Sequence, residues 1–454
     1  KGRYIAPFFF VKKTYLFYNM YIIKVMPFIV LGFFKIFCAK PIDPAILATV
    51  GSTQVTSFNF IDSYSKRLIN TELNDSKYER ERHLDELIKT KLFAQAAQNK
   101  KSSLNSRERS IIQLEKEKAM REELYNQIIN SQSVPTNDSI ARLHFQWLHT
   151  EIHIKHLFHK NKEILDSIKN RLIYNPELFD TFAVELFKNN KLKNSGGDLG
   201  WISYNTLDPA LEQSAFEIPV DEISNPIRSS YGWHIILKVN EKNQMIISEA
   251  DYQIQKVAII QSVSEKQKRI LADEYINNLM TSSISINDSI VIKTLHEIHW
   301  IITQKGEKLS KMLSIEDGEM LKNIILKLKL NQNLVLASFP GGNFTIHDFL
   351  DGLRRSKPIV FSNDPLQSFY IALRDKILTV EAKKLGLENN IIVQMKTKDA
   401  EDSYMARKYL LSLTKQSRTA HLSSKELNNI TKTLQSEIPI KIYDSNLTNL
   451  FQNR

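Results

Sequence analysis

Five histidines gather in one short stretch of the chain, and clustered histidines raise the question of metal binding. They are His144, His149, His153, His156 and His159. A zinc site needs three or four converging ligands, which cysteine or carboxylate side chains often complete. Alternation along a strand sends His153 and His156 to opposite faces, and neither a carboxylate nor a cysteine completes a set. We therefore expect no metal ion and no other cofactor.

Other reactive motifs give no stronger signal. The sequence contains neither a glycine-rich phosphate loop nor a nucleophile elbow. Several lysines could surround a site near the histidines, namely Lys155, Lys160, Lys162, Lys188, Lys191 and Lys193. They lack the planar fork with which arginine binds phosphate, so recognition of phosphorylated substrates is disfavoured.

The most specific local pattern lies in residues 196–239, which open with the letters GGDLGWISY. The three glycines of residues 196–200 favour positive φ, and Asp198 can accept hydrogen bonds from nearby backbone amides. This predicts a tight turn that leads into a short strand at residues 201–204.

The rest of the pattern predicts a helix and a closing strand. Asp208 is a helix N-cap and Pro209 suits the first helical position, so a short helix starts there. Asn225-Pro226 restores extended chain, and an apolar strand follows at residues 234–239.

In this order and spacing, these features resemble the parvulin family of peptidyl-prolyl cis-trans isomerases. The matching letters are GGDLGW, LDPALEQSAF, the acidic turn DEIS and the closing SSYGWHII. That family begins with a strand ending in histidine and then a helix, which residues 151–158 (EIHIKHLF) and 161–172 fit. The resemblance covers about residues 151–240.

The resemblance implies two groups of site residues. The catalytic group is His156, His234, Ser229 and Asn189. The substrate-binding group is Leu207, Leu211 and Phe216, with Trp201 and Trp233 near its edges. In the family the two histidines face one another inside the sheet, where they share hydrogen bonds with hydroxyl groups. Direct chemical participation and a purely structural pairing both stay open for them.

Three positions depart from the family pattern. Leu207 and Leu211 stand where Met and Phe are usual, which keeps the pocket apolar but removes an aromatic wall. Asn189 stands where Asp or Cys is usual, and an amide carries no negative charge. Tyr231 occupies a position that is often small or polar. A weakly active isomerase and a catalytically silent domain are both consistent with these changes.

Composition limits the classes of protein that the chain can belong to. At 454 residues it is too long for one ordinary core, so we expect two or three domains. The net charge is +11, but the lysines are scattered without arginine clusters, which argues against nucleic acid as a partner. A single cysteine excludes an internal disulfide and a cysteine-based metal site.

The first 45 residues contain a segment typical of export signals. Residues 25–34 (VMPFIVLGFF) are apolar, follow Lys24 and precede Ala39. The run is too short to span a bilayer but suits the hydrophobic region of a signal peptide. A cleaved signal, lipidation at Cys38 and a short membrane anchor all stay open. Each predicts export to the periplasm or cell envelope, with membrane attachment through this segment as one option.

Residues 46–148 are expected to form a mainly helical domain. A hairpin is predicted at residues 46–55, and apolar residues at three-to-four spacing predict helices at 77–100 and 106–129. This arrangement resembles the helical chaperone portion of periplasmic parvulin proteins of the SurA and PpiD type. An apolar groove for unfolded chains and a closed helical bundle without a groove both stay open.

The last part, residues 243–454, is expected to be mainly helical again. It opens with a long helix at 249–280, and residues 284–295 are predicted as a short strand segment. Residues 336–351 then partly repeat 47–62, and residues 375–387 echo 85–100. We interpret this as a second chaperone-like element.

Together these patterns predict an α+β protein in which a parvulin-like domain, residues 149–242, is inserted between helical chaperone-like segments. The predicted function is an exported prolyl isomerase and chaperone for unfolded or nascent secreted and outer-membrane proteins. The alternative is a catalytically silent holdase or assembly subunit that uses the parvulin fold as a binding surface.

Overall fold

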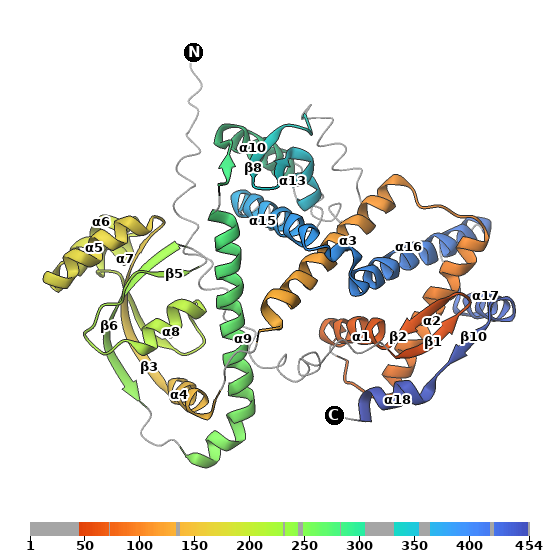
Figure 1. The fold of residues 1–454 in the computed structure, drawn as a ribbon, viewed down its shortest axis with the longest axis horizontal. Helices are drawn as coiled ribbons and strands as arrows, with labels where there is room; N and C mark the ends of the chain where they lie inside the picture. Colours follow the sequence, from red (N-terminus) through yellow and green to blue (C-terminus); the bar gives the residue numbers. More distant parts are fainter. Residues whose placement is uncertain are drawn as a thin grey trace. The chain divides into compact units, whose positions relative to one another are not determined.

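The computed structural model describes residues 45–71, 73–132, 137–229, 232–243, 248–281, 283–304, 331–353, 364–417 and 422–452. The expected signal or anchor segment and Tyr231 lie outside these residues. Backbone contacts group Gln132–Tyr275 into one unit, and the described residues of Phe33–Ser131 and Ile276–Arg454 into another. The sequence predicted four parts, residues 1–45, 46–148, 149–242 and 243–454, and these domain bounds stay a prediction. Figure 1 shows the described elements coloured along the chain.

The unit Gln132–Tyr275 is built on a four-stranded antiparallel sheet with the order β4-β3-β6-β5. The strands are β3 (Thr150–His159), β4 (Asp198–Ser203), β5 (Ile227–Ser229) and β6 (Gly232–Asn243). The central pair β3 and β6 places Phe158 opposite His234 and His156 opposite Ile236. These four side chains therefore share one face of the sheet, because opposed residues of an antiparallel pair point the same way.

Helices enclose this sheet on both faces. They are α4 (Asp138–Leu148), α5 (Lys162–Tyr174), α6 (Phe179–Leu186), α7 (Asn190–Asn194) and α8 (Pro209–Glu217), with a 3₁₀ turn η4 (Pro176–Leu178). The long helix α9 (Glu249–Thr281) contacts α4 and α8. Leu157 and Ile235 of the sheet pack with α5 and α6, whereas Ile154 and Ile236 pack with α8. Figure 1 shows α8 on the side of α9, and α5 and α6 away from it. The expected fold class, a small antiparallel sheet flanked by helices within a mainly helical α+β chain, is confirmed.

The second unit combines helices with two three-stranded sheets. The sheets have the orders β10-β1-β2 and β7-β8-β9. Their strands are β1 (Ile46–Val50), β2 (Thr53–Thr56), β7 (Ser285–Ile286), β8 (Val335–Phe339), β9 (Gly342–Thr345) and β10 (Ile440–Ile442). The helical elements are α1 (Ser57–Thr71), α2 (Lys77–Asn99), α3 (Ser106–Tyr125), η3 (Asn126–Asn130), α10 (Asp288–Gln304), α13 (Ile346–Leu353), α15 (Pro365–Lys384), η5 (Leu387–Asn389), α16 (Ile391–Ser417), α17 (Ser424–Glu437) and α18 (Asp444–Gln452).

The segments that echo each other in sequence have the same local construction. Each is a hairpin followed directly by a helix, and a threonine side chain at the junction bonds to the third residue after it. Thr56 Oγ1 donates to Asn59 Oδ1, and Thr345 Oγ1 donates to Asp348 Oδ2 at 2.8 Å. Asp348 also accepts from Lys376 Nζ at 2.7 Å.

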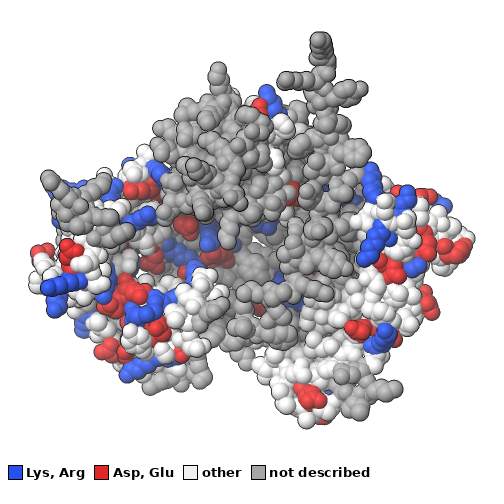
Figure 2. Space-filling view, turned by 180° about the vertical axis from the view of Figure 1, so that it is seen from behind, with Lys and Arg blue, Asp and Glu red and all other residues white. Residues whose placement is uncertain are grey.

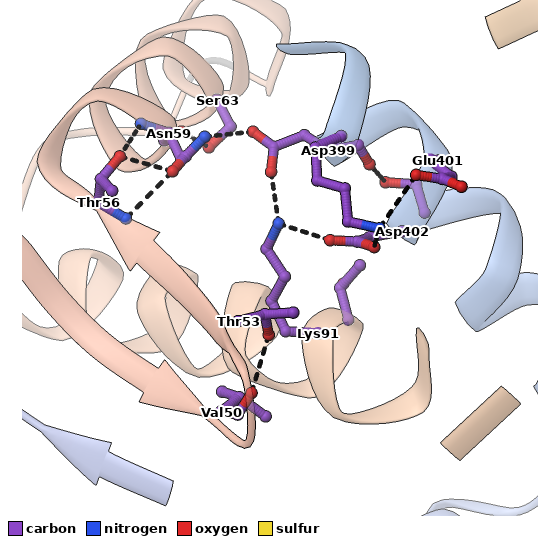
Figure 3. A network of polar contacts seen from close by, with 12 residues as sticks. Val50, Thr53, Thr56, Asn59, Ser63, Lys91, Asp399, Glu401 and Asp402 are labelled. Carbon is purple, nitrogen blue, oxygen red and sulfur yellow. Dashed lines mark hydrogen bonds and ion pairs between the residues drawn. The ribbon is translucent and has the colours of Figure 1, made fainter. Parts of the chain in front are cut away.

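A buried ion cluster joins α1 and α2 to α16. Lys91 Nζ on α2 donates to Asp399 Oδ1 at 2.6 Å and to Asp402 Oδ2 at 2.8 Å, both on α16. Asn59 Nδ2 donates to the other oxygen of Asp399 (Figure 3). Only 8% of the Lys91 side chain and 1% of that of Asp402 are exposed. Since an unpaired buried charge is costly, this cluster fixes α16 against α2.

One sequence-based prediction is wrong. Residues 284–295 were expected to form a strand segment, but only Ser285–Ile286 are strand, and α10 begins at Asp288. Val291, Leu295 and Ile298 are buried at helical spacing, so the apolar run packs as one face of a helix.

Two surface properties bear on function. No helix among the described residues is long and apolar enough to cross a bilayer. On the face drawn in Figure 2, Lys and Arg atoms lie among Asp and Glu atoms at the left and at the right of the picture.

Candidate active site

The glycine turn places its backbone directly against His156. The amide of His156 donates to Gly197 O at 2.9 Å, and Gly197 has φ of +79°. A Cβ at Gly197 would lie 2.2 Å from His156 O, so no larger residue fits. Asp198 Oδ1 accepts from the amide of Gly200 at 2.6 Å, as the sequence predicted. The turn therefore fixes both the end of β3 and the start of β4.

The two predicted histidines lie together. The ring centroids of His156 and His234 are 5.7 Å apart, with an interplanar angle of 25°. Phe187, in the segment after α6, stacks on His156 at 5.1 Å, and Phe158 lies 5.0 Å from His234. Both histidines are buried, with exposed fractions of 4% and 7%.

Ser229 is the polar partner of this pair. A hydrogen bond of 2.9 Å joins Ser229 Oγ and His234 Nε2, and Ser229 is itself buried. The Nδ1 atom of His234 and both ring nitrogens of His156 have no hydrogen-bond partner among the described residues. Burial lowers the pKa of His156 to about 3, with a further contribution from His234, and burial lowers the pKa of His234 to about 4. Both imidazoles are therefore neutral near pH 7.

Most of the predicted substrate-binding residues form an apolar cluster on the α8 side of the sheet. Leu211 and Phe216 of α8 are buried, and Leu207 is half-buried beside them. Leu199 on β4 contacts this cluster as well as the one beneath α5 and α6. The sequence analysis did not identify Leu199 as a residue of this cluster. Leucine is an ordinary residue type, so only its place in the strand that follows the glycine turn could have indicated this contact.

The two tryptophans lie outside this cluster. Trp201 is 38% exposed, with its ring 5.4 Å from that of His153 and Lys242 Nζ 3.6 Å from its centroid. Trp233 is half-buried and packs with the α5 and α6 cluster. Their proximity to a bound substrate stays a prediction.

Asn189 has a defined local role. It is the N-cap of α7, where its Oδ1 accepts from the amides of Lys191 at 2.9 Å and Leu192 at 3.3 Å. Such capping satisfies helix amides that otherwise lack partners. The expectation that Asn189 contributes to catalysis stays a prediction.

The remaining histidines of the cluster have separate partners. His144 Nδ1 bonds Tyr204 Oη at 2.5 Å, and His153 Nε2 bonds Asp198 Oδ1 at 2.8 Å. His149 and His159 bond backbone atoms nearby. Among the described residues, no group of three His, Cys, Asp or Glu side chains could hold a metal ion.

Comparison with protein families gives a match to this part of the chain. The model of the PPIC-type PPIase domain, or rotamase, matches residues 153–240. This chain carries a PPIC-type rotamase domain. The match begins within β3 and ends within β6, so it contains the glycine turn, α8, both buried histidines and Ser229.

Similar proteins include chaperones and foldases. Over 122 residues the chain is 25% identical to the chaperone SurA of Chromobacterium violaceum, which covers 27% of each protein. Over 181 residues it is 28% identical to the foldase protein PrsA of Oceanobacillus iheyensis, covering 38% of this chain and 58% of that one. The matches thus span from about a quarter to somewhat over half of these relatives.

The solved structures that match this chain are distant. The crystal structure of the peptidylprolyl isomerase PrsA from Bacillus anthracis is 18% identical, with a TM-score of 0.23, and the match covers 48% of this chain and 83% of that one. A structure described with two SurA-like chaperones of Campylobacter jejuni is 19% identical, with a TM-score of 0.21, and the match covers 53% and 98%.

Proposed function

We propose that the rotamase domain is an active prolyl isomerase within an exported chaperone. One observation carries the proposal: a neutral, buried histidine pair and its serine lie on the same sheet face as an apolar cluster with half-buried leucines. The pair is linked to that cluster through the sheet, since His156 lies opposite Ile236, which packs against α8.

Such a site suits a reaction that needs no covalent step. The barrier to rotation about the peptide bond is about 18–20 kcal/mol, because resonance gives the C–N bond double-bond character. Resonance also gives the planar amide a large dipole that water solvates well. Apolar surroundings that grip the proline ring therefore disfavour the planar amide relative to the twisted one, which lowers the barrier.

The histidines act in this proposal as positioning groups. Their ring nitrogens that lack partners are shielded from solvent, so they do not reach a substrate without movement of the domain. A neutral His234 bonded to Ser229 holds the short strand β5 against β6, and His156 with Phe187 holds the segment after α6 against β3. The pair thereby fixes the sheet face on which the leucines lie.

The proposed clients are unfolded or nascent exported polypeptides, including outer-membrane proteins. The similarity to a chaperone and a foldase supports this class of client. The proposed location is the periplasm or cell envelope, with membrane attachment through the apolar N-terminal segment as one form. The second unit, formed by the described residues of Phe33–Ser131 and Ile276–Arg454 and called the helical unit below, would hold clients through apolar and aromatic side chains.

The decisive test is prolyl isomerisation of an unphosphorylated Ala-Pro peptide by the full chain. We expect a rate above the uncatalysed exchange, which takes about 10–100 s at 25 °C. Leu207→Ala removes a half-buried cluster residue and should lower kcat/KM about tenfold, which corresponds to about 1.4 kcal/mol. The matched control is Leu186→Ala on α6, a half-buried leucine that packs with the other cluster and should leave kcat/KM unchanged.

Two assays of the same full-length chain distinguish the isomerase from the alternative, a catalytically silent holdase. A folded chain that leaves the peptide at its uncatalysed rate, yet suppresses aggregation of an unfolded client in light scattering, would be a silent holdase. Asn189 favours this alternative, since its side-chain oxygen is occupied by the α7 cap and carries no charge.

A further inference from the structure

Helix α9 follows the matched rotamase domain in sequence and packs first against α4, which precedes that domain. Its residues Tyr252, Ile259 and Val263 form a buried cluster with Ala141 and Phe145 of α4. Tyr252 Oη donates to Asp138 Oδ1 at 2.7 Å at the start of α4. Since the family match covers residues 153–240, both α4 and α9 lie outside the domain that it defines.

Farther along α9, Lys266 reaches the substrate-binding part of the domain. Lys266 Nζ forms an ion pair with Glu212 Oε2 of α8 and lies 3.5 Å from the ring centroid of Tyr204. Only 1% of the Glu212 side chain and 17% of that of Lys266 are exposed. The neighbouring Gln267 also bonds α8, with Nε2 donating to Gln213 Oε1 at 3.2 Å.

The other oxygen of Glu212 holds the loop before α8. Glu212 Oε1 accepts from the amide of Thr206 at 3.0 Å and lies 3.5 Å from that of Leu207. Asn205, which precedes them, has φ of +72°, a conformation that asparagine tolerates at some cost. The loop thus depends on an acceptor that is itself a buried carboxylate, and a buried carboxylate needs a cation to stay charged.

We propose that Lys266 is a positioning residue for the isomerase site: through Glu212 it holds the loop that presents Leu207. The inference rests on the proposed function and extends it, because it makes α9 a working part of the site. Without Lys266 the buried carboxylate loses its cation and turns toward water, so the amides of Thr206 and Leu207 lose their acceptor. The loop then samples more conformations, which weakens peptide binding and leaves the cluster on α8 in place.

The test compares Lys266→Met with Lys268→Met in the full chain. Lys268 is on the same helix and is also mostly buried, but its ion pair is with Glu265 of α9. We expect Lys266→Met to lower kcat/KM for an Ala-Pro peptide about tenfold through a higher KM, and Lys266→Arg to recover most of it. Amide hydrogen exchange of Thr206 and Leu207 should quicken about tenfold in Lys266→Met alone.

Three outcomes would overturn the proposal. They are unchanged exchange of the two loop amides in Lys266→Met, equal quickening in Lys268→Met, and a fall in kcat with KM unchanged. If Lys266→Met does not fold, Lys266→Gln, which keeps a neutral donor, serves in the same comparison. If the wild-type chain shows no isomerase activity, the proposed function fails, while amide exchange still decides whether Lys266 holds the loop.

Discussion

The buried histidines should make the rotamase domain sensitive to mild acid. In the unfolded chain each histidine has a pKa near 6.5, whereas burial lowers the pKa of His156 to about 3 and that of His234 to about 4. As the pH falls below 6.5, these histidines bind protons in the unfolded chain but not in the folded domain. The free energy of unfolding therefore falls. The loss continues until the pH reaches the folded pKa values.

The size of this effect follows from the two pKa values. Each pKa unit corresponds to about 1.4 kcal/mol, so lowering the pH from 7.5 to 5 costs about 2 kcal/mol for each histidine, most of it below pH 6.5. His144, whose pKa burial and then Lys266 lower to about 4, adds a similar amount. Replacing His156 by phenylalanine removes one of these contributions and keeps a ring that can stack on Phe187. His156→Phe should therefore lose about 2 kcal/mol less than wild type over this range.

Urea unfolding followed by tryptophan fluorescence measures the effect. Three of the four tryptophans, Trp147, Trp201 and Trp233, lie within the unit Gln132–Tyr275, called the rotamase unit below. Tryptophan fluorescence therefore reports mainly on the unfolding of this unit. Unfolding free energies would be compared at pH 7.5 and pH 5 for both proteins. An equal loss in wild type and His156→Phe would refute the argument that His156 is buried and neutral.

Two further substitutions test structural claims, each beside a matched control. Lys91→Met should destabilise the helical unit by about 3 kcal/mol, measured by urea unfolding with circular dichroism, because among the described residues it leaves Lys398 as the one ion-pair partner of the buried Asp402. Lys89→Met, which breaks an exposed pair on the same helix, should cost less than about 1 kcal/mol. Gly197→Ala should destabilise the rotamase unit by about 2 kcal/mol more than Gly200→Ala, since both have positive φ but only Gly197 lacks space for a Cβ. Equal effects within either pair would contradict the packing described.

Local signals in the sequence predicted the features that depend on neighbouring residues. The Asp208 cap, Pro209 at the first position of α8 and the positive φ of the glycine turn are all present, because each is set by atoms a few residues apart. Residues 284–295 were assigned wrongly because a short apolar run suits either a strand or a helix, and packing of Val291 and Leu295 decided the matter.

The site required information that periodicity does not contain. The pairing of His156 with His234 was predicted only through the family resemblance, since they lie 78 positions apart in the sequence. Phe187 and Lys266 were missed because their roles arise from tertiary contacts that leave no local pattern. A buried lysine in a long amphipathic helix reads in sequence as an ordinary solvent-facing residue.

The pairing of the first strand with the last has a consequence for synthesis. Strand β1 pairs with β10, and Ile46 O accepts from Asn446, 400 positions later. At about 5–20 residues per second, the first hairpin waits about 20–80 s for its partner strand. During this time one edge of β1 is open to association with other chains. The sheet of the rotamase unit, whose strands lie between residues 150 and 243, can form first. For about 20–80 s the chain therefore carries an exposed strand edge, beside a rotamase sheet that can already be folded.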